Sequence, residues 1–317
     1  MSAAPLVTAA SPWYTDQARS ERTTADAAVP VAGWRGRPVS RPARGDKTAI
    51  MTPSSVPVFI LCGGLGTRIK EETEFRPKPM VPVGDKPIIW HIMRTYSHFG
   101  FKKFVLCMGY KSEVIRNYFL NFYSMNSDAT VHLVDNSVTY HQINHDCDWE
   151  VTLAYTGEKT MTGARIAMAF DRYIGDAGTF AVTYGDGVTD VDLAAELAFH
   201  QAHGKTGTVL GVNPPSRFGE FRMDEDRLLA FAEKPEITHA WINGGFFFFN
   251  RGFRDYLSHD PALVLEQAPL SKLAADGGLH VYKHPGFWQC MDTQRDREHL
   301  TALWEQGKAP WAYSDDK

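Results

Sequence analysis

The stretch LCGGLGTRIKEETEFRPKP, residues 61–79, decides how the rest of the chain is interpreted. It follows the apolar run VPVFI and places three glycines, then Arg68, directly after this predicted strand. Ten residues beyond Arg68, Lys78 stands between two prolines. Glycines after a strand let backbone N–H groups approach an anion closely. A guanidinium can fork onto phosphate oxygens, whereas an ammonium acts as a point charge. The stretch therefore predicts a phosphate-binding site.

The two well-known glycine patterns do not match this stretch. A P-loop requires Lys and then Ser or Thr after its last glycine, and here Thr67 and Arg68 follow Gly66. A dinucleotide fingerprint requires a third glycine at the position of Ile69. A tight strand-to-helix turn with incidental surface charges remains an alternative, because glycine turns are common. The local pattern leaves the kind of phosphate site open.

The composition favours a soluble protein with a large core. The chain has 317 residues, 44% of them hydrophobic, and a formal net charge of -4, which gives no overall attraction to nucleic acid. No apolar run approaches the length of a transmembrane helix. None of the four cysteines forms a C-x-x-C pair, and two lie in apolar strand-like runs, which indicates buried reduced thiols. We therefore expect a cytoplasmic protein without nucleic-acid or membrane partners.

The N-terminal segment differs from the rest of the chain. It is rich in Ala, Pro, Arg, Ser and Thr, and it lacks the continuous apolar region of a secretory signal. We predict that residues 1–54 form a flexible tail and that residues 55–317 form the folded domain. Because Met51 stands just before the first strand, a further hypothesis is that the natural chain starts there, which mass spectrometry of the native N-terminus would test.

Predicted strands and helices alternate from Val56 onward. The apolar runs predict buried strands at 56–62, 102–109 and 178–187, and apolar stripes of helical period predict helices at 86–100, 112–124, 164–174 and 193–204. This alternation is typical of a doubly wound, mostly parallel, Rossmann-like sheet with helices on both faces. After Gly204, shorter runs at 206–212, 219–224 and 228–234 predict a smaller β-rich part. Ligands of such sheets bind beyond the carboxyl ends of the strands.

Two aspartates and a second lysine are further candidates for the phosphate-binding site. Asp186, between two glycines at the end of a predicted strand, suits Mg²⁺ bound together with substrate phosphates, although an ordinary Asp-Gly turn is the alternative. Asp292 alone is one surface aspartate among many. Lys234 precedes Pro235, so its backbone is restricted to extended forms, as expected for a lysine that grips a phosphate or for a solvated one.

Other kinds of site find less support in the sequence. His141, His145, Asp146 and Cys147 could bind a metal, but they lack the spacing of a zinc site. No G-x-S-x-G, Ser-His-Asp or protein-kinase set is readable. The best-supported candidates are the glycine loop, Arg68, Lys78, Asp186, Lys234 and Asp292. These residues are suited to binding phosphates and a metal, and none of them is an obvious nucleophile. This set predicts a transfer in which a phosphate oxygen of the substrate itself attacks.

These stretches resemble the sugar-1-phosphate nucleotidyltransferases. GGLGTR, PKP, TYGDGV and EKP carry the resemblance, which spans about residues 57–311, and MTGARI, INGGFF and PGFWQCMDT favour its cytidylyl branch. The resemblance implies a doubly wound sheet with a β-rich part for the sugar, and a homo-oligomer. It implies that CTP and α-D-glucose 1-phosphate react to CDP-glucose and pyrophosphate.

The resemblance also implies roles for particular residues. The residues implied to bind the nucleotide are Leu61, Cys62, Gly63, Gly64, Leu65, Gly66, Thr67, Arg68, Lys78, Thr160, Arg165 and Gly185. Those implied to contact the sugar phosphate are Gly219, Glu233 and Lys234. Asp186 and Asp292 are implied to bind Mg²⁺, and catalytic roles fall to Lys78, Arg68 and Asp186.

Two other functions remain open from the sequence. A thymidylyl- or uridylyltransferase would use the same motifs, because base choice depends on a few contacts that the motifs do not show. A catalytically silent subunit of this fold is the alternative from another class. Such a subunit has no need to keep Arg68, Lys78, Asp186 and Asp292 together.

Overall fold

A computed structural model describes residues 52–141, 147–214, 220–232 and 241–313. The chain divides into two units, Met1–Thr48 and Ala49–Lys317. All of the described residues belong to the second unit. The predicted tail, residues 1–54, lies almost wholly outside the described residues and stays a prediction.

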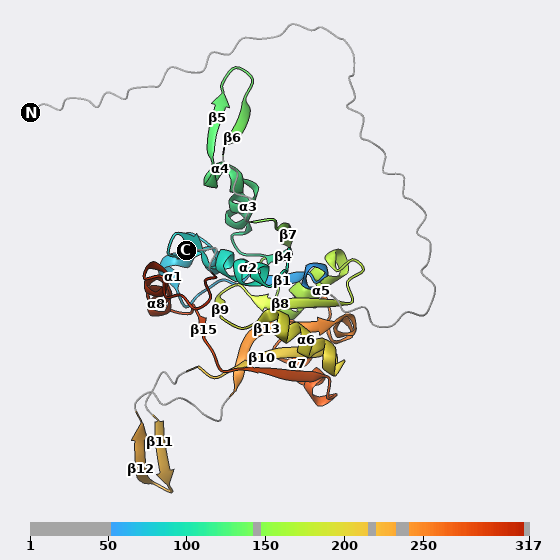
Figure 1. The fold of residues 1–317 in the computed structure, drawn as a ribbon. Coiled ribbons are helices and arrows are strands. Elements are labelled where there is room, and N and C mark those ends of the chain that lie inside the picture. Colours follow the sequence, from blue (N-terminus) through green and yellow to red (C-terminus); the bar gives the residue numbers. More distant parts are fainter. Residues whose placement is uncertain (1–51, 142–146, 215–219, 233–240, 314–317) are drawn as a thin grey trace, which may run out of the picture. The chain divides into compact units, whose positions relative to one another are not determined.

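A seven-stranded sheet forms the centre of the second unit (Figure 1). Its strands, in spatial order, are β7 (Glu150–Tyr155), β4 (Lys103–Met108), β1 (Val58–Cys62), β8 (Thr179–Tyr184), β13 (Ile242–Asn250), β10 (Gly207–Val212) and β14 (Leu279–His284). β1 runs parallel to β4 and β8, β4 to β7, and β10 to β14, whereas β13 runs antiparallel to both of its neighbours. The predicted doubly wound, mostly parallel sheet is confirmed.

Helices cover both faces of this sheet because its central strands are buried on both sides. Every residue of β1 is buried, and its side chains alternate between two hydrophobic clusters. The first cluster packs against α2 (Ile88–His98), α3 (Ser112–Leu120), α6 (Leu193–His203) and α8 (Gln294–Glu305). The second packs against α5 (Thr162–Tyr173), η3 (Arg251–Tyr256) and α7 (Ala268–Ala275). A continuous apolar run is what such a two-sided position requires.

The observed helices follow the predicted ones with one correction. Glycines in the left-handed region follow α2 and α6, namely Gly100 with φ 89° and Gly204 with φ 63°, as expected for helix ends. The single helix predicted at 112–124 is wrong, because α3 ends at Leu120 and α4 (Phe122–Asn126) begins after Asn121. The side-chain amide of Asn121 donates to the carbonyl of Asn117 at 2.9 Å, and the backbone N–H of Asn121 donates to the same carbonyl at 3.1 Å. The backbone leaves the helical conformation at Asn121 itself, with φ -105° and ψ 18°.

Shorter elements complete the described fold. They are η1 (Pro53–Ser55), α1 (Lys70–Thr73), η2 (Lys78–Met80), β2 (Pro82–Val83), β3 (Lys86–Pro87), β5 (Asp128–His132), β6 (Ser137–His141), β9 (Gly187–Thr189), β11 (Glu220–Asp224), β12 (Arg227–Ala232) and β15 (Trp288–Cys290). β11 pairs with β12 as an antiparallel hairpin, which agrees with two of the strands predicted after Gly204. The prediction that the run 206–212 belongs to a smaller β-rich part is wrong, because β10 pairs with β13 and β14 in the central sheet. No described helix is long and apolar enough to cross a membrane.

The strand order places a crevice beside β1. From β1 the chain adds β4 and then β7 on one side, and it returns to β8 on the other side of β1. At such a reversal the loops that follow the two central strands diverge and leave room for a ligand. The glycine stretch follows β1 and the sequence Gly185-Asp186 follows β8, so both predicted phosphate and metal motifs meet at this point.

Candidate active site

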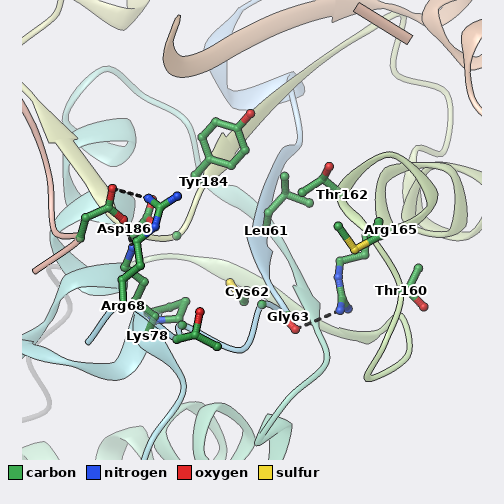
Figure 2. Close-up of a pocket in the computed structure, with 17 residues that line it drawn as sticks. Leu61, Cys62, Gly63, Arg68, Lys78, Thr160, Thr162, Arg165, Tyr184 and Asp186 are labelled. Atoms are coloured by element: carbon green, nitrogen blue, oxygen red, sulfur yellow. Dashed lines mark hydrogen bonds and ion pairs between the residues drawn. The ribbon is translucent and has the colours of Figure 1, made fainter. Parts of the chain in front are cut away.

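A cavity of about 340 Å³ lies at the carboxyl ends of β1 and β8 (Figure 2). Its lining residues are Leu61, Cys62, Gly63, Gly64, Gly66, Thr67, Arg68, Lys78, Pro79, Thr160, Met161, Thr162, Arg165, Tyr184, Gly185, Asp186 and Asp292. Of the residues predicted to bind the nucleotide, only Leu65 is not in this lining, and its side chain is exposed. The structure therefore brings the predicted set together.

The loop after β1 requires glycine at two positions. Gly66 has φ 62°, and a Cβ atom there would lie 2.6 Å from Cγ2 of Thr73. The Thr73 hydroxyl in turn donates to the carbonyl of Gly66 at 3.1 Å. A Cβ atom on Gly63 would lie 2.1 Å from Cζ of Arg165. The glycines therefore allow a tight turn and a close approach to a buried guanidinium.

Arg165 holds three loops of the site together. Its buried guanidinium donates to the carbonyls of Gly63, Met108, Gly157 and Glu158 and to the hydroxyl of Thr156, at distances from 2.7 to 3.2 Å. These groups follow or end β1, β4 and β7. Arg165 lines the cavity as predicted, and the contacts seen here hold the glycine loop in place.

Lys78 lies between two carboxylates at the charged end of the cavity. Its Nζ atom is 2.6 Å from Oδ2 of Asp186 and 2.6 Å from Oδ1 of Asp292. Burial alone would lower the pKa of Lys78, but the two carboxylates outweigh burial and raise it. Arg68, whose side chain is 74% exposed, pairs with Oδ2 of Asp292 at 2.8 Å. Lys78 therefore stays protonated, and Arg68 projects toward solvent.

The backbone around Lys78 explains why it lies beside Asp186. Pro77 is extended, with φ -68° and ψ 151°, and Lys78 opens the short helix η2. A Cβ atom on Gly185 would lie 2.8 Å from Cγ of Pro79, so only glycine lets the end of β8 approach the PKP segment this closely. Lys78 is thus held beside Asp186 by the close contact between Pro79 and the end of β8.

A short β-ladder brings Asp292 next to Asp186. β9 and β15 are antiparallel, with Gly187 opposite Cys290, and the N–H of Met291 donates to the carbonyl of Asp186 at 2.8 Å. The two aspartates stand at the ends of these paired strands. Their proximity is a consequence of strand pairing that the two local motifs do not encode.

The N-terminus of α8 fixes the backbone of Asp292. Thr293 and Asp296 form a capping box, and Oδ2 of Asp296 also accepts from the N–H of Asp292 at 3.1 Å. Burial would raise the pKa of Asp292, but the hydrogen bond and charge of Lys78, together with Arg68, hold this pKa below its usual range. Asp292 is therefore an ionised carboxylate at pH 7.

The two aspartates suit a divalent cation bound by oxygen atoms. Both carboxylates converge on one cationic atom, Nζ of Lys78, so their oxygens already face a common position. Mg²⁺ usually takes one or two protein carboxylates and completes its shell with phosphate and water. Within the described residues no group of three or more His, Cys, Asp or Glu side chains could hold a metal ion. Of the less favoured set His141, His145, Asp146 and Cys147, two members, His145 and Asp146, fall in residues 142–146, outside the described residues.

A second cavity of about 250 Å³ adjoins the first. It shares Arg68, Tyr184, Asp186 and Asp292 with the first cavity, and its other lining residues are Thr183, Gly187, Asn243, Gly244, Gly245, Phe246, Trp288 and Cys290. The indole Nε1 of Trp288 donates to the carbonyl of Gly244 at 2.7 Å. Sequence reasoning assigned no site role to Tyr184, Asn243 or Trp288. The glycine pair in INGGFF and the aromatic pair in PGFWQ were the sequence features that could have indicated a site at Asn243 and Trp288.

The three residues predicted to contact the sugar phosphate are not described. Gly219 falls in residues 215–219, and Glu233 and Lys234 fall in residues 233–240. Their predicted roles therefore remain predictions.

Comparison with known proteins agrees with this fold. The sequence model of the family Nucleotidyl transferase matches residues 58–271, and the chain belongs to this family. The chain is 48% identical over 252 residues to glucose-1-phosphate cytidylyltransferase of Salmonella typhi, covering 80% of this chain and 97% of that protein. It is 30% identical over 251 residues to mannose-1-phosphate guanylyltransferase 1 of Arabidopsis thaliana, covering 77% and 63%. The crystal structure of HddC from Yersinia pseudotuberculosis has the same fold, with a TM-score of 0.56, 22% identity, and coverage of 78% of this chain and 99% of that chain.

Proposed function

We propose that this protein is a glucose-1-phosphate cytidylyltransferase, which transfers CMP from CTP to α-D-glucose 1-phosphate and releases pyrophosphate. The observation that carries the proposal is the charged end of the cavity, where Lys78, Asp186 and Asp292 converge. This arrangement occurs in a chain that is 48% identical to a glucose-1-phosphate cytidylyltransferase over nearly the whole length of that relative. The product is CDP-glucose.

The shape of the first cavity suits a nucleoside triphosphate. Figure 2 shows Arg68, Lys78 and Asp186 at one end and Thr160, Thr162 and Arg165 at the opposite end. We place the phosphates at the charged end, next to the glycine loop, because backbone N–H groups and fixed cations bind phosphate oxygens. The base then lies toward the N-terminus of α5.

The second cavity suits a sugar phosphate. The Trp288 ring offers a flat apolar surface, and the Asn243 side chain offers polar groups for hydroxyls. The two cavities share Arg68, Asp186 and Asp292, so the phosphate of the sugar would lie next to the α-phosphate of CTP. We assign to this cavity the sugar phosphate that Gly219, Glu233 and Lys234 are predicted to contact.

The chemical step requires no nucleophile from the protein. An oxygen of the glucose 1-phosphate attacks the α-phosphorus of CTP, the bond from this phosphorus to the bridging oxygen of the β-phosphate breaks, and pyrophosphate leaves with the electron pair. Because both substrates are anionic, Lys78 and Arg68 reduce their repulsion and hold them in line. The raised pKa of Lys78 keeps its charge in place at pH 7.

Asp186 and Asp292 would hold Mg²⁺ in this reaction. When bound, the ion supplies positive charge to the phosphate oxygens as negative charge builds on them. The convergence of the two carboxylates on one cationic atom supports this assignment. Lys78 would continue to balance their charge from the side of the PKP segment.

We also propose that the protein is a homo-oligomer in the cytoplasm. The segment 120–140 supports self-association, because it exposes many large apolar side chains: Leu120, Tyr123, Met125, Val131, Leu133, Val134, Val138 and Tyr140. Exposed apolar groups of this kind mark interaction surfaces, and an isolated two-stranded hairpin is marginally stable in water. The buried free thiols Cys62 and Cys107 support a reducing compartment.

A comparison of nucleotides tests the proposed function. Pyrophosphate release is measured with glucose 1-phosphate and Mg²⁺, using CTP, dTTP or UTP at equal concentration. We expect CTP to give the highest kcat/KM. A higher value with dTTP or UTP would establish the thymidylyl- or uridylyltransferase alternative. No release with any of the three would favour the silent subunit.

A further inference from the structure

Tyr184 lies where the two cavities meet. It is the last residue of β8, two positions before Asp186, and it lines both cavities. A Cβ atom on Gly245, which has φ 79°, would lie 2.4 Å from Cδ2 of Tyr184, so the ring packs directly against this glycine. The edge-on ring of Phe247 lies 6.1 Å away. Packing therefore confines the Tyr184 ring to one place.

The Tyr184 hydroxyl is tied to a carboxylate outside both cavities. It donates to Oε1 of Glu266, whose Oε2 accepts from the hydroxyl of Thr162 at 3.0 Å. Because a carboxylate oxygen only accepts hydrogen bonds, the Tyr184 hydroxyl is the donor to Glu266. Glu266 thus connects the residue between the cavities to Thr162, which opens α5 and lines the first cavity.

The segment that carries Glu266 also holds the N-terminus of α5. The N–H of Met161 donates to the carbonyl of Pro261 at 2.8 Å, and the N–H of Gly163 donates to that of Leu263 at 2.9 Å. The N–H of Leu265 donates to the hydroxyl of Thr162 at 2.8 Å. The wall of the first cavity and the segment 261–266 are therefore connected by several hydrogen bonds.

We propose that Glu266 is a positioning residue that, by bridging Tyr184 and Thr162, fixes the wall of the nucleotide cavity relative to the ring at its junction with the sugar cavity. This inference rests on the proposed function. Glu266 lines neither cavity, so it acts through its two partners and not on the substrates. Its effect is on alignment of the attacking phosphate oxygen with the α-phosphorus, to which transfer rates are steeply sensitive.

The test measures kcat and KM of Glu266→Ala, Glu266→Gln and Tyr184→Phe with CTP and glucose 1-phosphate and compares them with those of the wild type. Because misalignment affects the transition state more than binding, we expect Glu266→Ala and Tyr184→Phe to lower kcat by about 10- to 100-fold, with each KM changed by less than about 3-fold. Glu266→Gln retains an oxygen that accepts from Tyr184 and should recover most of the kcat. The double variant should lose little more than the worse single variant, since the two side chains act as a unit.

A second tyrosine–carboxylate pair provides the matched control. The hydroxyl of Tyr256 donates to Oδ2 of Asp276 at 2.9 Å, and neither residue lines a cavity. We expect Asp276→Ala to leave kcat within about 2-fold of the wild type, as for a surface contact away from the site. An equal loss of kcat in Asp276→Ala and Glu266→Ala would overturn the proposal.

The experiment distinguishes failure of this proposal from failure of the proposed function. Wild-type kcat in both Glu266→Ala and Tyr184→Phe would overturn the proposal while the proposed function stands. No CDP-glucose from the wild-type protein would contradict the proposed function itself. Glu266 is exposed, so its replacement leaves the core intact. If Glu266→Ala nevertheless melts early, Tyr184→Phe, which removes one hydroxyl, decides the question.

Discussion

At the scale of single residues, Lys78 connects the two carboxylates of the charged end. Replacing it with alanine removes the cation that both aspartates contact at 2.6 Å and leaves their charges facing each other. We predict that Lys78→Ala lowers kcat by about 10²-fold or more, the usual cost of losing one positioned charge in a transfer site. Pyrophosphate release at saturating CTP and glucose 1-phosphate measures this change.

A lysine elsewhere in the chain serves as the control for this prediction. Lys103 is exposed at the start of β4, the end of the strand away from the site. Lys103→Ala should retain wild-type turnover. Near-normal turnover in Lys78→Ala would remove Lys78 from the catalytic set.

Glu196 predicts a pH dependence of stability that is separate from catalysis. This residue of α6 is fully buried, and within the described structure its carboxyl oxygens have no hydrogen-bond partner. Burial raises the pKa of Glu196 well above its usual value of 4.5. The folded state therefore binds a proton that the unfolded state releases, so stability is retained below pH 4.5 and decreases as the pH rises, by up to about 1.4 kcal/mol per pH unit.

Glu196→Gln removes this titration. We expect the variant to exceed the wild type in free energy of unfolding at pH 8, and the difference to shrink at pH 5. Urea unfolding at both pH values measures it. An equal difference at the two pH values would show that Glu196 does not carry the effect.

At the residue scale, the sequence predicts the charged residues of the site better than the aromatic residues that line its cavities. Arg68, Lys78 and Asp186 are visible because glycines and prolines surround them in short motifs. Tyr184 and Trp288 are not, since each looks like an ordinary core aromatic until strands far apart in sequence bring it to a cavity. Asp292 requires the resemblance, because nothing local distinguishes it from other surface aspartates.

At the scale of elements, the capping box of α8 links helix stability to the site. Thr293→Ala removes the side chain that caps the helix, at a cost of about 1 kcal/mol in the free energy of unfolding. It also loosens Asp296, which holds the backbone N–H of Asp292. We therefore predict a kcat loss in addition to the loss of stability, measured by urea unfolding and pyrophosphate release.

The N-cap of α6 offers the matched comparison. The carboxylate of Asp192 accepts from the N–H of Ala195 at 2.8 Å and lines neither cavity. Asp192→Ala should cost a similar stability and retain kcat. If Thr293→Ala retained as much kcat as Asp192→Ala, the capping box of α8 would have no effect on the reaction.

The elements themselves follow closely from the sequence where the pattern is continuous. Apolar runs locate β1, β4 and β8, and glycines mark the ends of α2 and α6. The break at Asn121 and the ladder between β9 and β15 were not predictable in the same way. The first is a change of backbone conformation at a single residue, and the second depends on pairing between distant segments.

At the scale of the whole molecule, the exposed apolar segment 120–140 predicts self-association. Leu133 and Val134 are 87% and 102% exposed at the turn of the β5–β6 hairpin. We expect light scattering to give the wild type a mass that is a multiple of 35.5 kDa, and Leu133→Asp/Val134→Asp a mass nearer 35.5 kDa. Charges at these positions would make burial against a second copy unfavourable. A monomeric wild type would contradict the proposed homo-oligomer.

The most direct measurement is the identification of the product made by the wild-type protein. CTP, α-D-glucose 1-phosphate and Mg²⁺ are incubated with the wild type and with Asp186→Asn, and the mixture is analysed by mass spectrometry. We predict CDP-glucose and pyrophosphate in equal amounts from the wild type, with about 10²-fold less from Asp186→Asn, because a neutral amide cannot replace the carboxylate. The absence of CDP-glucose from the wild type, or its equal formation by Asp186→Asn, would contradict the assignment of this reaction to this site.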